Sequence, residues 1–520
     1  MSIADYHERA ALAAAQVIAG FDSDLFRKTL EHTGVGVAIG RQGATSNEGK
    51  FLADLVVRLL ARLYPCLELR VEVSQEGERL AALARAINPR IEFISDASIG
   101  ISIGKEAPSF KDTYFAGSNG WDALLSSRET VPTGSSQNPF GAGAASCFAV
   151  ANLFNRILIP DWEHRITTDL LFSTFKREKE KTSADIPNGN WSLTGEAVLV
   201  GLGAVGNGVV WALALSSLTG TLHIVDHETL ELSNLQRYVL AKRSDEGKTK
   251  IEIAERHLRG PLKPRPHQQK WAEFVGVAGY DWPHVLVALD SAADRRAVQA
   301  SLPKWIANSW TQPGDLGISV HNRFDGLGAC LACLYLPSGS VPNEDEIVAR
   351  ALGVPGMLNE IRTLLHTGKG VSRALIESVG AALGRPVQDV LRYEGRPVRD
   401  LYVEGVCGGG LIPLGSTGTA SRALHVPLAH QSALAGVLLA AALVRRSLLP
   451  EEEGTLITRV DILRAVPDYV TQSALKAGNG LCICEDSEYV AAFRAKYSTA
   501  EAANTDETLA LNRPIKVVPD

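Results

Sequence analysis

The stretch from residue 197 to residue 226 reads AVLVGLGAVGNGVVWALALSSLTGTLHIVD and decides the fold of the second half of the chain. Its first four residues are an apolar run that predicts a buried strand, followed by a glycine loop with Gly201, Gly203 and Gly206. An apolar helix and a second strand come next, and that strand ends on Asp226. This arrangement is typical of nucleotide-binding α/β folds, in which the loop amides face phosphate and the acid takes a ribose hydroxyl.

The residues after the acid favour ATP over NAD. Asn234 and Arg237 lie in the run SNLQR soon after the acid, and Lys250 ends the run GKTK. NAD brings only a pyrophosphate, whereas a triphosphate that is being cleaved carries more charge. An arginine suits that charge as a bidentate donor, and a lysine suits it as a point charge.

These motifs, in this order, resemble those of the ThiF/MoeB/ubiquitin-activating-enzyme superfamily, whose members adenylate the C-terminus of ubiquitin-like proteins. The resemblance implies that the three glycines form the nucleotide loop and that Asp226 holds the ribose. It also implies phosphate contacts from Asn234, Arg237 and Lys250. Tyr238 departs from the family, which commonly has glutamine at this position.

A further apolar run, Val285 to Leu289, predicts a strand that ends at Asp290. An acid at the carboxyl end of a parallel strand lies at the binding crevice. Asp290 and Ser291, with Arg295 following, match the family pattern Asp-Asn/Ser-x-x-x-Arg, which implies that Asp290 binds Mg²⁺ with ATP. The residues alone leave a second role open, because Asp290 could cap a helix that begins at Ser291.

Two cysteine pairs lie far apart in the sequence. Cys330 and Cys333 form a Cys-x-x-Cys pair, and Cys482 and Cys484 form a Cys-x-Cys pair. The resemblance implies that the four thiolates hold a structural Zn²⁺ in closed, four-coordinate geometry, although the family usually has Cys-x-x-Cys in both places. The alternative is two reduced thiol pairs without metal.

A single cysteine, Cys407, begins the glycine-rich run CGGGLIPLG. This run is similar to the family segment Cys-x-x-x-Gly-hydrophobic-hydrophobic-Gly-Pro. The resemblance implies that the Cys407 thiolate attacks the adenylate to form a thioester, with Arg237, Lys250 and Asp290 serving the adenylation step. The alternative for Cys407 is a small buried hydrophobic residue, which is the role we predict for Cys66 and Cys147.

The first part of the chain repeats the strand–helix order of the second. The glycine loop of residues 40–43 is degraded, and neither the Asn-Leu-x-Arg nor the Gly-x-x-Lys motif follows it. We interpret residues 1–165 as a second copy that has lost its nucleotide site, and an unrelated α/β domain is the alternative. Two lobes in one chain imply an intramolecular pseudo-dimer. Association of two chains into a homodimer is an additional possibility that the sequence leaves open. Arg27 is a candidate for an arginine that reaches the ATP site from the first lobe.

The predicted fold class is α/β, with tandem Rossmann-like folds of the ThiF adenylation type and a helical insertion. The predicted domains are an inactive adenylation-like domain (1–165), a charged linker (166–190), an active ATP-binding domain in two segments (191–337 and 405–485), a helical insertion that forms the catalytic-cysteine region (338–404) and a C-terminal tail (486–520).

Composition excludes several classes of function. The net charge of −6, with acids and bases mixed, favours neither nucleic acid nor an anionic membrane as a partner. The N-terminus is charged and lacks the apolar core of a signal peptide, and the apolar run from 433 to 444 is too short to span a bilayer. We therefore expect a cytoplasmic protein, in which paired cysteines favour metal over disulfides.

The sequence as a whole predicts an enzyme that uses ATP and Mg²⁺ to activate a ubiquitin-like protein and passes it to a partner that resembles a ubiquitin-conjugating enzyme. A bacterial conjugation system associated with antiviral defence, of the Bil or CBASS type, is the hypothesis for its setting. The nearest alternative is an adenylyltransferase for a sulfur-carrier protein in cofactor biosynthesis. An NAD(P) oxidoreductase leaves Asn234, Arg237, Lys250 and the paired cysteines unexplained, and the intact motifs argue against a scaffold without activity.

Overall fold

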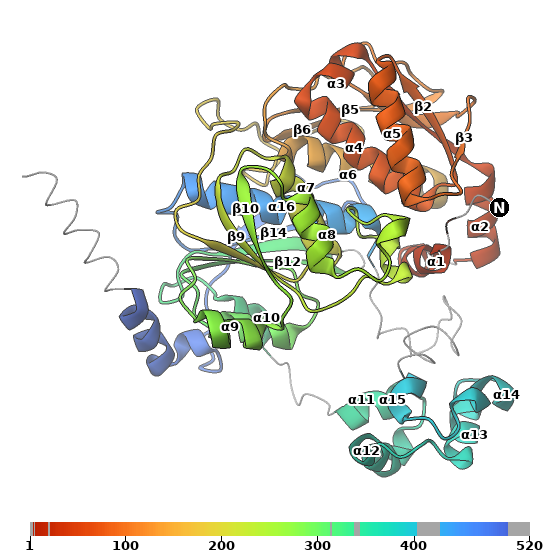
Figure 1. Ribbon diagram of the computed structural model, residues 1–520, viewed down its shortest axis with the longest axis vertical. Helices are drawn as coiled ribbons and strands as arrows, with labels where there is room; N and C mark the ends of the chain where they lie inside the picture. The colour runs from red at the N-terminus through yellow and green to blue at the C-terminus, as the bar shows by residue number, and fades with distance from the viewer. Residues whose placement is uncertain are drawn as a thin grey trace, which may run out of the picture. The chain divides into compact units, whose positions relative to one another are not determined.

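The computed structural model describes residues 4, 6–18, 21–312, 315–336, 344–402 and 427–497 of the 520 (Figure 1). They fall into two compact units. One unit comprises residues 1–7, 29–336 and 428–520, and contains two sheets; the other comprises residues 8–28 and 337–427.

The first sheet has seven strands in the order β3-β2-β1-β4-β5-β6-β7. Strands β1 to β5 are parallel to one another, and the pairs β5–β6 and β6–β7 at one edge are antiparallel. The strands are β1 (Gly34–Ile39), β2 (Cys66–Val71), β3 (Glu92–Phe93), β4 (Ile99–Ile103), β5 (Asp112–Asn119), β6 (Asp122–Ser126) and β7 (Leu170–Ser173).

The second sheet has eight strands in the order β10-β9-β8-β11-β12-β13-β14-β15. Its first five strands in sequence are parallel, and its last three form an antiparallel edge. The strands are β8 (Ala197–Val200), β9 (Gly220–Val225), β10 (Leu262–His267), β11 (His284–Val287), β12 (Trp305–Gln312), β13 (Asp315–His321), β14 (Thr455–Val460) and β15 (Thr471–Ser473).

The two sheets share one topology. In each, the first strand lies inside the sheet, the second and third extend to one side, and the fourth to seventh extend to the other. The second sheet adds only β15 at its edge. The prediction of tandem Rossmann-like folds is confirmed. We call the parts built on these sheets the first lobe and the second lobe. The first sheet continues through β7 (Leu170–Ser173), which falls inside the predicted linker 166–190, because this short strand lacks a pattern that sets it apart from a loop.

Helices flank both sheets. The described helices of the first lobe are α3 (Arg41–Thr45), α4 (Asn47–Leu63), α5 (Ser74–Ile87) and α6 (Phe140–Leu158), whereas most of α1 (His7–Ala15) and most of α2 (Ser23–His32) belong to the other unit. Those of the second lobe are α7 (Ala204–Leu215), α8 (Lys250–His257), α9 (Trp271–Ala278), α10 (Ala292–Ala300) and α16 (Ala429–Leu448).

Residues 344–402 of the other unit are helical. They form α11 (Glu344–Ala351), α12 (Leu358–Thr367), α13 (Arg373–Ala382), α14 (Val387–Val390) and α15 (Val398–Asp400). These helices bury an apolar core of their own that includes Leu352, Ile361, Leu375 and Tyr393. Cys407 lies outside the described residues.

Helix α16 joins the two lobes. It packs on α7, β12 and β13 of its own lobe and on α6 of the first lobe (Figure 1). Its close approach to α7 requires glycine, because a Cβ on Gly436 would lie 2.6 Å from the Cα of Gly208. Within the described part of the chain, α16 is the only helix long and apolar enough to cross a membrane, yet 78% of that segment is buried in the fold. Such burial is typical of a core helix.

A histidine at this lobe interface should make stability depend on pH. His430 of α16 is buried against the ring of Phe154 on α6, with 5.6 Å between the ring centroids, and burial lowers its pKa from 6.5 to about 3. Below pH 6.5 the unfolded chain takes up a proton that the folded chain excludes. The free energy of unfolding should therefore fall as the pH drops from about 6.5 towards 3.

The variant His430→Leu removes this titration. Between neutral pH and about pH 5.5 it should lose about 1 kcal/mol less stability than the wild-type protein loses. Urea unfolding of both proteins at the two pH values measures the difference. Equal losses would show that His430 is not held neutral by the fold.

Candidate nucleotide site and cysteine cluster

The glycine loop follows β8 and leads into α7. Gly201 adopts φ +91°, a left-handed conformation that glycine tolerates and other residues rarely do. A Cβ on Gly206 would collide with the carbonyl oxygen of Gly201. Gly203 is the N-cap residue of α7 and offers no side-chain cap to the amides of the first turn. The first-turn amides of this 12-residue helix, and the positive end of its dipole, are therefore available to an anion.

Asp226 follows β9 and lies against the loop. Its carboxylate accepts hydrogen bonds from the amide of Leu202 at 2.6 Å and from the amide of Glu228 at 2.9 Å. The side chain is 8% exposed. Asp226 thus ties the end of β9 to the glycine loop, and it stands where the sequence predicts the ribose contact.

The next predicted contacts lie on a short 3-10 helix, Leu232–Gln236, and just beyond it. Asn234 orders this turn, because its Oδ1 accepts a hydrogen bond from the amide of Glu231 at 3.1 Å. The Arg237 guanidinium carbon lies 5.5 Å from the ring centroid of Tyr238. Burial lowers the pKa of Arg237, while Tyr238, Asp290 and Glu231 act in the opposite direction. Asp290 is thus one of the groups that favour the charged form of Arg237.

Lys250 is the first residue of α8 and is 6% exposed. Its ammonium group forms an ion pair with Glu228 and lies 5.3 Å from the ring centroid of Tyr238. Burial acts to lower its pKa, but Tyr238, Asp226 and Glu228 outweigh burial and raise it. Lys250 is therefore a buried, permanently charged group beside the loop.

Tyr238 lies between the glycine loop and the two cations. Its hydroxyl would be 3.6 Å from a Cβ on Gly203, and both Arg237 and Lys250 contact its ring. The sequence marked Tyr238 only as a departure from the family's glutamine. The structure shows an aromatic ring that spaces the two cations, a role for which the sequence carries no signal.

Asp290 follows Ala288 and Leu289, which lie against Gly201, and is exposed. The helix that follows it is capped by Ser291, whose Oγ accepts a hydrogen bond from the amide of Asp294 at 3.3 Å. The capping role that the sequence left open for Asp290 is therefore wrong. Arg295 of the same motif is buried and donates to the carbonyl oxygens of Leu289 and Ser309, so it anchors the backbone next to Asp290.

The four paired cysteines come together in one cluster. Their Sγ atoms all lie within 4.8 Å of one another. Cys330 is 3.4 Å from Cys482, and Cys333 is 3.4 Å from both Cys482 and Cys484. A tetrahedral zinc site with Zn–S bonds of about 2.3 Å has S···S edges of about 3.8 Å. The cluster therefore has the composition and the size to hold zinc, and the shorter Cys-x-Cys spacing completes it.

The cluster fastens the end of the described chain to the second lobe. Phe493 and Tyr497, on helical residues 487–497, pack against the cysteines together with Phe324. The Tyr497 hydroxyl donates to the carbonyl oxygen of Leu302 at 2.9 Å. The predicted tail, 486–520, thus begins with a packed helix.

Three other candidates from the sequence have different surroundings. Cys147 is fully buried in α6, and burial raises its pKa; Cys66 is half-buried at the start of β2. Arg27 lies on α2, where it forms an ion pair with Asp24 at 3.5 Å. Its predicted approach to the ATP site stays a prediction.

The sequence also missed contributions from the first lobe. Two arginines of α4, Arg58 and Arg62, donate hydrogen bonds to backbone carbonyls that directly follow Arg237 in the second lobe. Their spacing of four residues marks one face of a helix, but gives no sign of what that face contacts.

Two protein families match parts of the chain. Residues 193–338 match the ThiF family, and residues 38–159 match the Prokaryotic E2 family C. The first match covers the glycine loop, Asp226, Arg237, Lys250 and Asp290, and ends after the first cysteine pair.

Individual proteins show similarity over different lengths. Protein y4jF of Sinorhizobium fredii is 42% identical over 512 residues, which cover 96% of this chain and 98% of y4jF. The Nedd8-activating enzyme E1 catalytic subunit of Drosophila melanogaster is 33% identical over 110 residues, 21% of this chain and 24% of the fly protein. The corresponding subunit of Saccharomyces cerevisiae is 28% identical over 163 residues, 29% of this chain and 54% of the yeast protein.

Among solved structures, that of Escherichia coli MccB with ATP has a TM-score of 0.33 and 14% sequence identity, over 56% of this chain and 66% of MccB.

Proposed function

The chain belongs to the ThiF/E1-like group of adenylating enzymes, in one family with y4jF, and from this premise we propose that it activates a ubiquitin-like protein. In the first step the C-terminal carboxylate of that protein attacks the α-phosphate of ATP and releases pyrophosphate. In the second step the Cys407 thiolate attacks the adenylate, AMP leaves, and a thioester forms.

The second lobe supplies positioning and charge for the first step. A carboxylate is a poor electrophile, and adenylation converts it into a mixed anhydride. In-line attack on phosphorus needs the triphosphate to be held and its charge neutralised, more than it needs covalent help from the protein. The glycine loop and the N-terminus of α7 would hold phosphate, and Asp226 would hold the ribose.

The observation that carries the proposal is the pair of cations around Tyr238. Arg237 is half-buried, Lys250 is buried, and both face the ring beside Gly203. Burying two positive charges at a phosphate loop is costly, and an anionic ligand with more charge than a pyrophosphate compensates for the cost. A dinucleotide brings only a pyrophosphate, so a site for it does not need two such cations.

Magnesium would bind at Asp290. Its carboxylate is exposed beside the loop, does not cap α10, and interacts with Arg237. A hard cation such as Mg²⁺ prefers carboxylate and phosphate oxygens, and when bound it would neutralise charge on the leaving pyrophosphate.

The other cysteines support Cys407 as the thioester carrier. The chain has seven cysteines. Four of them form the cluster that we propose binds zinc, and Cys147 is fully buried with a raised pKa. A thiolate nucleophile needs access and a pKa that is not raised by burial. Cys66 is the remaining alternative, and it lies at the amino end of β2, whereas nucleotides bind beyond the carboxyl ends of strands.

We propose that the first lobe is an inactive copy of the adenylation fold. Glu48, in the first turn of α4, is 1% exposed and accepts hydrogen bonds from Ser118, Gly120 and Ser136 at 2.6 to 3.2 Å. This carboxylate places a negative charge near the degraded loop and uses hydrogen-bond donors that a phosphate would need. The match of residues 38–159 to the Prokaryotic E2 family C raises a transfer role for this lobe, but its buried Cys147 does not suit one.

A gel assay tests the function. The full chain is incubated with ATP, Mg²⁺ and the ubiquitin-like protein encoded by a neighbouring gene, and the products are separated with and without thiol reductant. We expect pyrophosphate release and an adduct that reductant removes. Cys407→Ala should abolish the adduct but keep pyrophosphate release, and the matched variant Cys66→Ala should keep both.

The other outcomes point elsewhere. Pyrophosphate release without an adduct would exclude Cys407 as the carrier and favour the sulfur-carrier adenylyltransferase. An adduct lost only in Cys66→Ala would move the thioester to the first lobe. Addition of a conjugating-enzyme-like protein from the same neighbourhood should move the modifier from Cys407 to that partner, and such a neighbourhood would support the proposed role in antiviral defence.

A further inference from the structure

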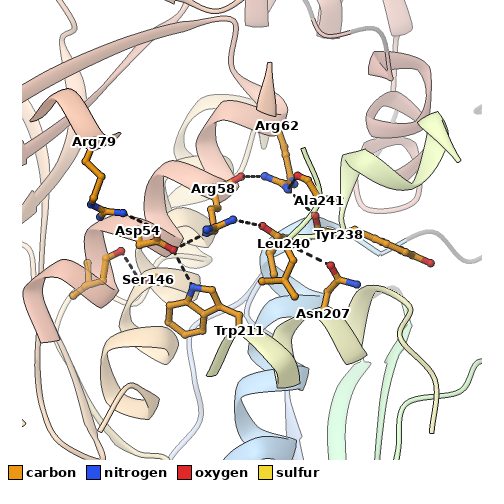
Figure 2. A network of polar contacts seen from close by, with 12 residues as sticks. Asp54, Arg58, Arg62, Arg79, Ser146, Asn207, Trp211, Tyr238, Leu240 and Ala241 are labelled. Atoms are coloured by element: carbon orange, nitrogen blue, oxygen red, sulfur yellow. Dashed lines mark hydrogen bonds and ion pairs between the residues drawn. The ribbon is translucent and has the colours of Figure 1, made fainter. Parts of the chain in front are cut away.

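Two arginines of the first lobe bind the backbone of the second lobe next to the ATP site. Arg58 Nη1 donates to the carbonyl oxygen of Val239 at 3.0 Å (Figure 2). Arg62 Nη2 donates to the carbonyl oxygens of Tyr238 and Ala241, both at 2.6 Å. Three carbonyls of one four-residue turn, residues 238–241, are thus held from α4 of the other lobe.

The same turn is fastened to the glycine loop from within the second lobe. Asn207 Oδ1 accepts a hydrogen bond from the amide of Leu240 at 3.3 Å, and its Nδ2 donates to the carbonyl oxygens of Leu202 and Gly203 at 2.9 and 3.0 Å. The turn therefore has a fixed relation to the loop on one side and to α4 on the other (Figure 2).

The arginines are themselves rigidly held. Arg58 forms an ion pair with Asp54 at 2.6 Å, and Asp54 also accepts a hydrogen bond from Trp211 of α7 at 3.0 Å. Arg62 Nη1 donates to the carbonyl oxygen of Arg58 at 2.6 Å. Arg62 is 2% exposed, and within the described residues it is held by carbonyl oxygens without a carboxylate ion-pair partner.

Such burial makes these hydrogen bonds strong. A buried guanidinium without an acid partner depends on the hydrogen bonds that its N–H groups make, and bonds from a charged donor are roughly twice as strong as neutral ones. In Arg62 the two Nη atoms make these bonds, whereas the buried Nε has no hydrogen-bond partner among the described residues. Burial lowers the pKa of Arg62 to about 10, which leaves it protonated at neutral pH. Displacing the turn would therefore leave a buried charge with fewer partners.

The clamped turn begins with residues of the ATP site. Tyr238 supplies one of the clamped carbonyls and also the ring between Lys250 and Gly203. Arg237 precedes it directly. A misplacement of about 1 Å is enough to cost about 100-fold in a reaction that depends on orientation. The position of this backbone therefore sets the position of Arg237 and of the Tyr238 ring that lies beside Lys250.

We propose that Arg58 and Arg62 are positioning residues of the ATP site, supplied by the first lobe to the second. They act through the backbone of residues 238–241 and do not touch the nucleotide. The inference rests on the proposed function of the second lobe as an ATP site. It gives the first lobe a task in the reaction that requires no nucleotide of its own.

Nucleotide binding to the full chain tests the proposal. Calorimetric titration with MgATP should show affinity at least about tenfold weaker in Arg62→Gln than in the wild-type protein. Affinity for AMP, which lacks the β- and γ-phosphates, should fall much less. The clamp, by which we mean the hydrogen bonds from Arg58 and Arg62 to residues 238–241, holds the turn beside Arg237 and Tyr238 and does not contact Asp226. A loss of packing alone would weaken both nucleotides alike.

Arg445→Gln is the matched control. Arg445 of α16 also donates across the lobe interface, to the carbonyl oxygen of Phe175 at 2.5 Å, and it is largely buried, but it lies on another part of the interface. Its variant should lower the unfolding temperature in the same way as Arg62→Gln while changing MgATP affinity by less than about twofold.

The outcomes separate this proposal from the function on which it rests. A wild-type protein that does not bind MgATP would refute the ATP site itself. A wild-type protein that binds MgATP, with Arg62→Gln and Arg445→Gln changed equally, would refute the clamp. If Arg62→Gln does not fold, Arg62→Lys decides, because lysine keeps the charge but loses the two-carbonyl geometry: weaker MgATP binding supports the clamp, and wild-type affinity refutes it.

Discussion

The variant Lys250→Ala should slow adenylation by about 100- to 1,000-fold. Lys250 is the buried cation at the start of α8, and neighbouring groups raise its pKa, so it carries a full positive charge wherever the pH keeps the protein folded. Preorganised charges at a phosphoryl centre cost no reorganisation during the reaction, which is why losing one has so large an effect. The variant also leaves Glu228 without its ion-pair partner, and that free carboxylate would repel the triphosphate.

Pyrophosphate release with saturating ubiquitin-like protein measures the effect. Lys248→Ala is the matched control, since Lys248 lies two residues earlier and pairs with Asp245 at 2.9 Å, outside the site. It should keep the rate within about twofold, because Lys248 is half exposed and Asp245 keeps its ion pair with Arg256 at 2.7 Å. Equal loss of activity in Lys248→Ala and Lys250→Ala would refute the role assigned to Lys250.

The variant Cys482→Ser should release the metal and destabilise the second lobe. Cys482 lies 3.4 Å from both Cys330 and Cys333, so its thiolate joins the two pairs. Zinc binding contributes about 10 kcal/mol or more to folding of small zinc domains, and part of that contribution would be lost here. Because Phe493 and Tyr497 pack against the cluster, helical residues 487–497 should detach first.

Two measurements check this prediction. Elemental analysis should find one zinc per wild-type chain and much less in Cys482→Ser, and the unfolding temperature should fall by at least about 5 °C. Cys66→Ser, which removes a thiol far from the cluster, should keep the zinc and nearly all of the stability. Wild-type protein that is purified without zinc and is unaffected by a chelator would show that the cluster is four reduced thiols.

The nucleotide loop and the cysteine cluster could be predicted because the residue types carry their own chemistry. Gly201 and Gly206 are needed by backbone geometry, and Asp226 stands at the strand end that every such fold uses. The family resemblance matched Cys330 with Cys482 across 152 residues as ligands of one zinc ion, and the structure brings their Sγ atoms within 3.4 Å of each other.

The rest of the site depends on contacts that a sequence does not encode locally. Arg58 and Arg62 occupy one face of α4, and charged residues on a helix face are usually solvated. Only packing of the first lobe against the second turns them into buried ligands of a backbone turn. For the same reason no role for Tyr238 could be predicted, since Arg237 and Lys250 come to lie beside its ring from different elements.

The residue that caps α10 could not be predicted from the sequence either. Aspartate and serine are both good N-cap residues, and their order in the sequence does not decide which one caps. The backbone places Ser291 at the cap, and the Asp290 side chain is exposed.

Titration of the full chain with MgATP and, separately, with NAD⁺ tests the central claim most directly. We predict that ATP binds at a single class of site, that Lys250→Ala removes most of that affinity, and that NAD⁺ does not compete. Binding of NAD⁺ with no binding of MgATP would contradict the account, because Arg237 and Lys250 would then face a pyrophosphate that does not need them.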